Sequence, residues 1–248
     1  MATLFVSDLH LDPSRPGITR LFGEFVDGEA RKADALYILG DLFEAWIGDD
    51  DDSPLARDVA ALLRQTSDAG CELAFLPGNR DFLIGEAWLN RCGARLLQEP
   101  VQLDSFGHRT VLLHGDAECI ADTDYQRFRQ QVRSDAWRTA FLSQDLAARR
   151  QFAAHARAQS QAHTRAASAY LMDADAGELQ QRIDDAAAEL LIHGHTHRPA
   201  LHLLHGAHGT AIRAVLGAWH RQPSWLVVDP QAVHLHAEGR VLSAGWGS

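Results

Sequence analysis

Short apolar runs that end in polar loops recur along the chain. They fall at residues 4–7, 36–39, 73–76 and 111–113, and again at 190–192, 211–216, 225–228 and 233–236. Runs of this length bounded by turn residues predict buried β-strands. Helix-like stretches lie between the early runs, at 18–30, 55–67 and 83–92. The alternation predicts an α/β protein built of packed layers.

The strand pattern stops in the middle of the chain, where Ala, Gln and Arg of high helix propensity dominate. We therefore expect a core made of residues 1–121 and 186–248, and a helical insert or cap at 122–185. Residues 125–170 hold eight arginines and two aspartates, a local charge of +6 in a chain whose net charge is −10. This contrast predicts either a surface that meets anions or a solvated helix face.

Composition narrows the functional classes. A net charge of −10 argues against nucleic acid as a general partner, since binding to phosphate backbones needs a positive footprint. No apolar run reaches the roughly 18 residues that span a bilayer, and the N-terminus enters a strand pattern without a basic region. We expect a cytoplasmic protein. Its three cysteines, an odd number at wide spacings, predict reduced thiols.

Polar side chains gather where the predicted strands end. The clusters are Ser7-Asp8-Leu9-His10, Gly40-Asp41, Gly78-Asn79-Arg80-Asp81, His114-Gly115-Asp116 and Gly194-His195-Thr196-His197. Open α/β sheets place ligands at the carboxyl ends of their strands. Carboxylate, amide and imidazole groups are preferred ligands of divalent cations, and two such cations can clamp a phosphate and lower the pKa of a bound water. The clusters therefore predict a two-metal centre.

In order and spacing these clusters resemble the calcineurin-like metallophosphoesterases, which have an α/β sandwich fold. The resemblance implies that Asp8, His10, Asp41 and His197 hold one cation, and that Asp41, Asn79, His114 and His195 hold the other. Asp41 would bridge them, which a carboxylate can do because its two oxygens can serve two cations. Asp81 and Asp116 are expected either to orient histidines and loop backbone or to be ordinary turn residues.

Arg80 departs from the broad family pattern, in which His often follows Gly-Asn as a candidate general acid. Arginine cannot donate a proton at any relevant pH, but it can clamp phosphate and stabilise charge in a transition state. This choice fits a leaving group that is itself a phosphate. It predicts a diphosphate substrate rather than a simple alkyl ester.

The chain resembles more closely, over essentially its full length, the UDP-2,3-diacylglucosamine diphosphatase family of lipid A biosynthesis. The resembling stretches are 5–11, 40–50 (Gly-Asp-Leu-Phe-Glu-Ala-Trp-Ile-Gly-Asp-Asp), 78–83 (Gly-Asn-Arg-Asp-Phe-Leu), 113–116, Asp122 with 125–129, and 192–199. The resemblance implies metal-hydroxide attack on the pyrophosphate of a UDP-sugar lipid, giving UMP and 2,3-diacylglucosamine 1-phosphate. It also implies that the protein binds two divalent metal ions, which are expected to be manganese. It further implies a peripheral membrane protein on the cytoplasmic side of the inner membrane.

The resemblance assigns roles to individual residues. Those expected to act in catalysis are Asp41, Asn79, Arg80, His114 and His195. Those expected to face the substrate are Asn79, Arg80, Asp122, Tyr125, Arg157, Ser160, Thr164, Ala167 and His195. Thr164 and Ala167 depart from the Asn and Lys that the family often carries there. The insert would form a lid, with Trp46, Phe82, Trp137, Phe141, Phe152 and Met172 as candidates either for acyl-chain contact or for core packing.

Two other functions fit parts of the pattern. A soluble nucleotide phosphodiesterase or a dinucleoside polyphosphate hydrolase could use the same scaffold and chemistry. An interaction module could keep the scaffold after losing its ligands, but all the ligand positions are present here. Nothing in the sequence indicates an obligate protein partner.

Overall fold

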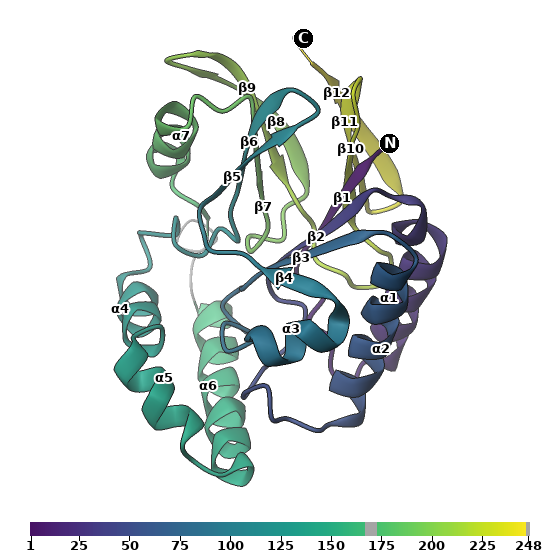
Figure 1. Ribbon diagram of the computed structural model, residues 1–248. Helices are drawn as coiled ribbons and strands as arrows, with labels where there is room; N and C mark the ends of the chain where they lie inside the picture. The colour runs from purple at the N-terminus through teal and green to yellow at the C-terminus, as the bar shows by residue number, and fades with distance from the viewer. Residues whose placement is uncertain (167–172, 247–248) are drawn as a thin grey trace.

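Two β-sheets pack face to face between layers of helices (Figure 1). The computed structural model describes residues 1–166 and 173–246, with side chains described for residues 1–158 and 173–246. Helices α1, α2 and α3 lie on the outer side of one sheet, while α7 lies beside the other. The helices α4, α5 and α6 form a separate group below the second sheet in the view of Figure 1.

The first sheet has seven strands in the order β12-β11-β10-β1-β2-β3-β4. Strands β1, β2, β3 and β4 are parallel to one another, while β10, β11 and β12 continue the sheet in antiparallel fashion. The strand bounds are β1 Thr3–Val6, β2 Ala35–Leu39, β3 Glu72–Leu76, β4 Ala94–Leu96, β10 Trp225–Val228, β11 Ala232–Ala237 and β12 Arg240–Gly245.

The second sheet has five strands in the order β5-β6-β7-β9-β8. Strands β6, β7 and β9 run parallel, and the outer strands β5 and β8 are antiparallel to their neighbours. The bounds are β5 Val101–Ser105, β6 His108–Leu112, β7 Leu190–His193, β8 Ala200–Gly206 and β9 Gly209–Val215.

Alternation along the strands divides the hydrophobic core between the layers. In β1, Leu4 and Val6 join the cluster that α1, α2 and α3 cover, whereas Phe5 joins the cluster between the two sheets. In β7, Ile192 faces the other sheet while Leu191 packs with α7. Successive side chains of a strand point to opposite faces, so each buried strand supplies two cores. This explains why the central strands read as continuous apolar runs.

The helices of the core begin and end where their flanking residues predict. They are α1 Pro16–Gly28, α2 Pro54–Asp68 and α3 Glu86–Cys92, with a short 3₁₀ turn at Ala30–Lys32. Helices α1 and α2 carry proline in the first turn, where its missing N–H costs nothing. Ser53 caps α2 by accepting a hydrogen bond from the Ala56 backbone N–H, and Gly93 ends α3 in the left-handed conformation.

Helices also fill the segment for which an insert was predicted. They are α4 Thr123–Val132, α5 Asp135–Leu142, α6 Leu146–Ala166 and α7 Ala176–Asp185. The side chains of Asp122 and Ser134 cap α4 and α5. Leu179 and Ile183 of α7 pack with Leu191 in the outer core of the second sheet. Thus α7 is part of the layered body, whereas α4, α5 and α6 form a separate group in Figure 1, from which α5 contributes Phe141 to the core cluster of the first sheet.

The eight strands and three core helices predicted from the sequence are confirmed, with shifts of at most three residues at their ends. The described residues hold four more strands, β4, β5, β8 and β12, that were not predicted. The three cysteines are free and buried. None of the helices in the described part of the chain has the length and apolar character needed to cross a membrane.

Candidate metal centre

The sheets bring the polar strand ends to one place. Asp8 and His10 follow β1, Asp41 follows β2, and Asn79 follows β3, so three parallel neighbours in the first sheet supply four side chains. The parallel neighbours β6 and β7 of the second sheet supply the rest, which are His114, His195 and His197. Because the carboxyl ends of parallel strands meet at one edge, the two sheets face each other there with all seven side chains.

The backbone at this edge is strained. Positive φ angles, rare for residues with a side chain, occur at Asp8 (55°), His10 (48°), Asp41 (54°), His195 (64°) and His197 (56°). Such strain persists only where the surrounding structure fixes it, and it clusters at functional sites. The sharp turns direct these side chains out of the strands and toward one another.

A first set of ligand atoms converges around His197. Its Nε2 lies 3.2 Å from Asp8 Oδ1 and 3.3 Å from His10 Nε2. Asp41 Oδ2 lies 3.8 Å from His10 Nε2. Asp8, His10 and His197 place one ligand atom each within 4.8 Å of one another, as an ion site requires.

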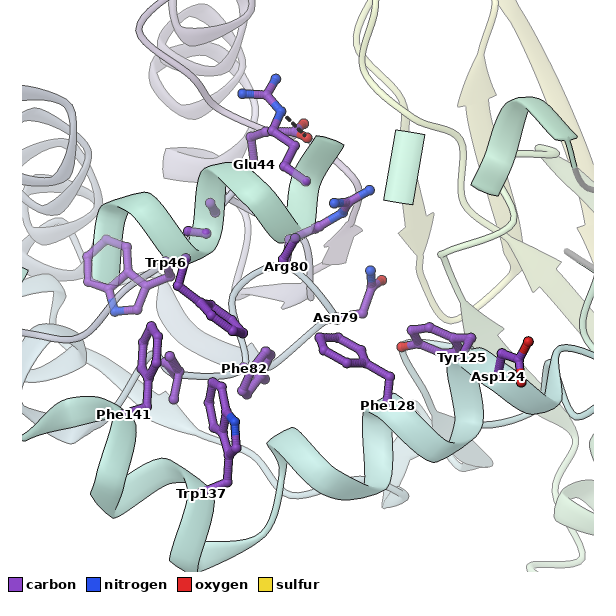
Figure 2. Close-up of a pocket in the computed structure, with 16 residues that line it drawn as sticks. Glu44, Trp46, Asn79, Arg80, Phe82, Asp124, Tyr125, Phe128, Trp137 and Phe141 are labelled. Carbon is purple, nitrogen blue, oxygen red and sulfur yellow. Dashed lines mark ion pairs between the residues drawn. The ribbon is translucent and has the colours of Figure 1, made fainter. Parts of the chain in front are cut away.

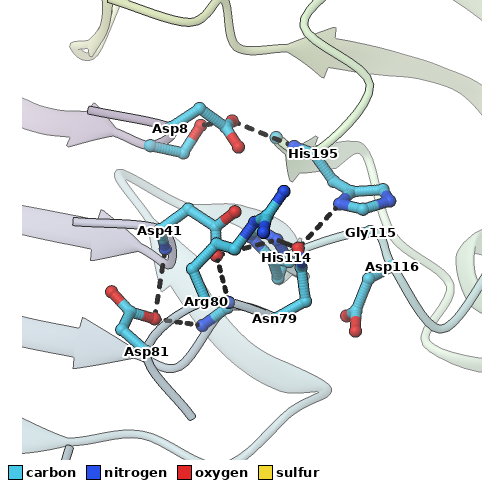
Figure 3. A network of polar contacts seen from close by, with 12 residues as sticks. Asp8, Asp41, Asn79, Arg80, Asp81, His114, Gly115, Asp116 and His195 are labelled. Carbon is cyan, nitrogen blue, oxygen red and sulfur yellow. Dashed lines mark hydrogen bonds and ion pairs between the residues drawn. The ribbon is translucent and has the colours of Figure 1, made fainter. Parts of the chain in front are cut away.

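A second set converges on the other oxygen of Asp41 (Figure 3). Asn79 Oδ1 lies 3.0 Å from both His114 Nε2 and His195 Nδ1. Asp41 Oδ1 lies 3.6 Å from His114 Nε2. Asp41 therefore offers one oxygen to each set, which is the arrangement predicted for a bridging carboxylate.

The protonation states of His10 and His195 fit divalent cations, whereas nearby carboxylates raise the pKa of His114 and of His197 against the effect of burial. Burial lowers the pKa of His10 to about 3 and that of His195 to about 4, so both imidazoles are neutral near pH 7 and offer lone pairs. Burial, with the charges of Asp81 and Asp8 nearby, raises the pKa of Asp41 to about 7. Asp8 Oδ1 is buried without a hydrogen-bond partner. Crowded carboxylates and an unpaired buried oxygen are what a positive ion would relieve.

Groups around the ligands hold them in place. The His114 Nδ1–H donates to the Leu39 carbonyl at 2.8 Å, which leaves Nε2 free to coordinate. Asp81 accepts hydrogen bonds from the backbone N–H groups of Gly78 (2.9 Å), Leu42 (2.7 Å) and Asp41 (3.2 Å). The prediction that Asp81 orients loop backbone is confirmed.

Asp116 acts differently from what the sequence predicted. It is fully buried and accepts hydrogen bonds from the Tyr125 hydroxyl at 2.5 Å and from Arg129 Nε at 2.8 Å. Both partners lie on α4, so Asp116 joins this helix to the core instead of orienting a histidine. The Tyr125 ring in turn stacks at 6.3 Å from the ring of His195.

A cavity of about 320 Å³ opens beside the second ligand set (Figure 2). Asn79, Arg80, Tyr125 and Arg157, all predicted to face substrate, line it. Asp122 instead caps α4 by accepting from the Tyr125 backbone N–H. Ser160, Thr164 and Ala167 lie outside the described side chains.

Aromatic side chains from the core and the insert form the far wall of this cavity. Five of the six apolar candidates line it, namely Trp46, Phe82, Trp137, Phe141 and Phe152, while Met172 lies outside the described residues. Their rings contact one another, with centroid distances of 4.7 Å for Trp137 and Phe141 and 6.1 Å for Phe82 and Trp137.

Two wall features were not predicted. Phe128 lines the cavity three residues after Tyr125, and this helical spacing places both rings on one face of α4. Arg157 makes ion pairs with Asp12 (3.1 Å) and Glu44 (3.0 Å). The helical spacing in the sequence could have pointed to Phe128, whereas no local pattern predicts an ion pair between residues so far apart in the chain.

The positively charged insert meets carboxylates of the protein itself. Arg129 pairs with Asp116 and Glu99, Arg149 with Asp50, and Arg157 with Asp12 and Glu44. The predicted anion-facing surface is thus in part the contact between the insert and the acidic core.

Comparisons with known proteins agree with this geometry. The family model described as calcineurin-like phosphoesterase matches residues 1–199. Together with the two facing sheets and the polar strand ends, this match shows that the chain belongs to the calcineurin-like phosphoesterase family.

Within the family, the chain is similar over nearly its whole length to proteins named UDP-2,3-diacylglucosamine hydrolase. It is 48% identical over 246 residues to that of Xanthomonas oryzae pv. oryzae (strain PXO99A), covering 95% of this chain and 98% of the relative. It is 50% identical over 222 residues to that of Cellvibrio japonicus (strain Ueda107), covering 90% and 92%. A solved archaeal phosphodiesterase has 12% identity and a TM-score of 0.47, covering 99% of both chains. The chain is a hydrolase.

Proposed function

We propose that the protein hydrolyses the pyrophosphate bond of UDP-2,3-diacylglucosamine, giving UMP and 2,3-diacylglucosamine 1-phosphate in lipid A biosynthesis. The observation that carries this proposal is the position of the aromatic cavity, whose wall includes Asn79 of the ligand cluster and Arg80 beside it. A diphosphate at the cluster could thus place an apolar chain in the cavity. The names of the curated relatives support the same substrate.

Two divalent cations, manganese by preference, would be held by the two ligand sets that share Asp41. Such cations supply Lewis acidity toward phosphoryl oxygens and lower the pKa of a bound water. The donors are carboxylate, amide and imidazole, a mixture that suits manganese as well as magnesium or zinc.

The chain's own residues would position the diphosphate and stabilise its charge. Arg80 would bind phosphoryl oxygens with its planar guanidinium, and its backbone N–H already donates to Asp41 Oδ1 at 2.9 Å. Asn79 belongs to the second ligand set and also lines the cavity, so it would contact both the cation and the substrate. The leaving group is a phosphate monoester with a second pKa near about 6, so it departs at neutral pH without a proton from the enzyme.

The insert would act as the lid over the lipid half of the substrate, with α4, α5 and α6 as its working part. Tyr125, Arg157, Ser160, Thr164 and Ala167 would contact the sugar and its phosphate, and the aromatic wall would contact an acyl chain. Asp122 would contribute by starting α4 in the right place. Burying an acyl chain would contribute up to about 0.8 kcal/mol per methylene.

The lipid substrate implies work at a membrane surface, and we propose a peripheral place on the cytoplasmic side of the inner membrane. Exposed apolar side chains support this. Phe128, Leu142 and Phe152 of α4, α5 and α6 are 42%, 39% and 39% exposed. Together with Ile120 (46%), which precedes the insert, they are exposed apolar side chains that a membrane surface would cover.

The direct test is hydrolysis by the purified full chain, freed of metal and then given one divalent cation at a time. The expected result is manganese-dependent release of UMP from UDP-2,3-diacylglucosamine at a kcat/KM far above that for soluble nucleotide diesters. Equal or higher kcat/KM for the nucleotide diesters would favour the nucleotide phosphodiesterase function instead.

A further inference from the structure

A second cavity, of about 410 Å³, adjoins the ligand cluster at His197. Among the described residues it shares no lining side chain with the aromatic cavity. The residues that line it are His197, Pro199, Gly217, Ala218, His220, Arg221, Gln222, Pro223, Ser224, Ala237 and Glu238. Its volume falls in the range of about 300–1,000 Å³ that is usual for small-ligand sites.

The wall of the second cavity is held by hydrogen bonds to the backbone of the ligand cluster. The loop between β9 and β10 carries most of the lining, and it crosses from the second sheet to the first. The backbone N–H of Trp219 in this loop donates to the backbone carbonyl of Asp8 at 3.1 Å. Arg15 Nη2 donates to the backbone carbonyl of Trp219 at 2.9 Å. The Trp219 side chain is fully buried and meets Phe22 edge-on, with ring centroids 6.0 Å apart. A loop anchored in this way presents a preformed surface.

The chemistry of the wall differs from that of the aromatic cavity. Its side chains are polar or small, with Arg221, Gln222 and Glu238 as the groups able to specify a ligand. The end of β11 and the turn after it add Ala237 and Glu238 to the lining, and the turn lies close to Gln222, since a Cβ placed on Gly239 would lie 3.1 Å from Gln222 Oε1. An amide offers both a donor and an acceptor, as do the edges of a pyrimidine base, and a carboxylate can accept from ribose hydroxyls.

We infer that this second cavity binds the nucleoside half of the substrate, with Gln222 and Arg221 as specificity-determining residues. The inference rests on the proposed function, in which a diphosphate at the cluster joins a lipid half to a nucleotide half. The lipid half suits the aromatic cavity beside Asn79. The nucleotide half then extends past His197 into the second cavity, whose wall includes both His197 and Pro199.

The test uses calorimetry on the manganese-loaded full chain, with UMP and inorganic phosphate as probes. Both probes can occupy the cluster, but only UMP reaches the second cavity. We expect UMP to bind at least about tenfold more tightly than phosphate, and Gln222→Ala or Arg221→Ala to weaken UMP binding about tenfold, as for loss of one hydrogen bond. Arg20→Ala, an exposed arginine on α1, is the matched control and should bind UMP as the wild type does.

Hydrolysis on the same preparations separates the two proposals. The variants should show a raised KM for UDP-2,3-diacylglucosamine with a smaller change in kcat, and thermal melting should match the wild type. Wild-type hydrolysis combined with unchanged UMP binding in both variants would overturn the nucleoside site and leave the proposed function standing. Absence of wild-type hydrolysis would overturn the proposed function, and the nucleoside site with it.

Discussion

The two oxygens of Asp41 face different sets of ligands, with Oδ2 at 3.8 Å from His10 Nε2 and Oδ1 at 3.6 Å from His114 Nε2. The left-handed backbone at Asp41, Asp8 and His10 costs on the order of 1–3 kcal/mol at each residue. The backbone N–H groups of these residues are bonded, that of Asp41 to Asp81 and those of Asp8 and His10 to the Gly40 and Asp41 carbonyls, which offsets part of that cost. The ligands are therefore placed before any cation arrives.

Removal of the Asp41 carboxylate should disable the site. Asp41→Ala takes a ligand from both cations and a counter-charge from between them, so kcat should fall by at least about 10²-fold. The measurement is turnover at limiting manganese, with circular dichroism to confirm the fold. Near-normal turnover in this variant would mean that the two ligand sets do not share Asp41.

Arg80 should matter through charge and geometry and not as an acid. Arg80→His supplies a titratable group yet loses the two-pronged contact with phosphate, so kcat should fall by more than KM rises. Arg80→Lys, which keeps the charge, should lose less than Arg80→His. Steady-state kinetics on the diphosphate decide, and a kcat equal to wild type in Arg80→His would exclude Arg80 from the chemical step.

The raised pKa of Asp41 predicts how metal and pH act together on stability. A carboxyl whose pKa rises from 3.8 to about 7 on folding stabilises fully below about pH 3.8 and loses that contribution as pH rises through 7. A cation replaces this proton, so manganese should raise the melting temperature more near pH 8 than near pH 5.5. Thermal melting with and without manganese measures this, and Asp41→Asn should reduce the difference. An equal gain at both pH values would contradict it.

At this scale the sequence could predict that the seven polar side chains meet, but not the ion pairs that surround them. Each ligand sits at the end of an apolar run, so the local pattern marks it. The partners of Asp116 and Arg157 lie on other elements. Only the tertiary fold brings Arg129 to Asp116 and Glu44 to Arg157.

Among the elements, the strands that escaped prediction share one property, which is that each forms the edge of a sheet. β12 and β4 flank the first sheet, and β5 and β8 flank the second. An edge strand is partly exposed, as the three exposed or half-buried residues of β4 illustrate, so it lacks the continuous apolar run of a central strand. The hydrophobic pattern therefore predicts the central strands of each sheet but not the edge strands.

The helices α4, α5 and α6 are joined to the core by ion pairs as well as by hydrophobic packing, since Phe141 of α5 lies in the core cluster of the first sheet. Arg149, whose side chain is 3% exposed, pairs with Asp50 and donates to the Ile47 carbonyl at 2.6 Å. Asp50 belongs to an acidic run that would otherwise be a solvated loop. The charge contrast between insert and core thus has a structural use.

Loss of the Arg149 contact should loosen the insert without unfolding the core. Arg149→Ala leaves Asp50 and the Ile47 carbonyl without their partner, so limited proteolysis should cut the insert several times faster than in wild type. Arg127→Ala is the matched control, because Arg127 makes an ion pair with Asp124 within α4 at an exposed site. Equal cleavage rates in both variants would show that Arg149 does not hold the insert.

Across the whole molecule, the cluster lies between two cavities of different chemistry, one aromatic and one polar. Remote binding energy is useful only to substrates that possess the remote group. Phe128→Ala and Arg157→Ala should therefore impair hydrolysis of the UDP-sugar lipid about tenfold more than hydrolysis of a small chromogenic phosphodiester. Leu203→Ala, an exposed apolar residue on β8, is the control. Equal losses on both substrates would make the insert a structural support only.

The most direct test of the account is product analysis with the metal-free full chain and UDP-2,3-diacylglucosamine, before and after manganese is added. We expect no reaction before addition and, after it, UMP and 2,3-diacylglucosamine 1-phosphate in equal amounts. Asp41→Ala should yield neither product at a comparable rate. Release of UDP in place of UMP would contradict cleavage at the pyrophosphate bond. Full turnover without a divalent cation would contradict a role for the two ligand sets that share Asp41.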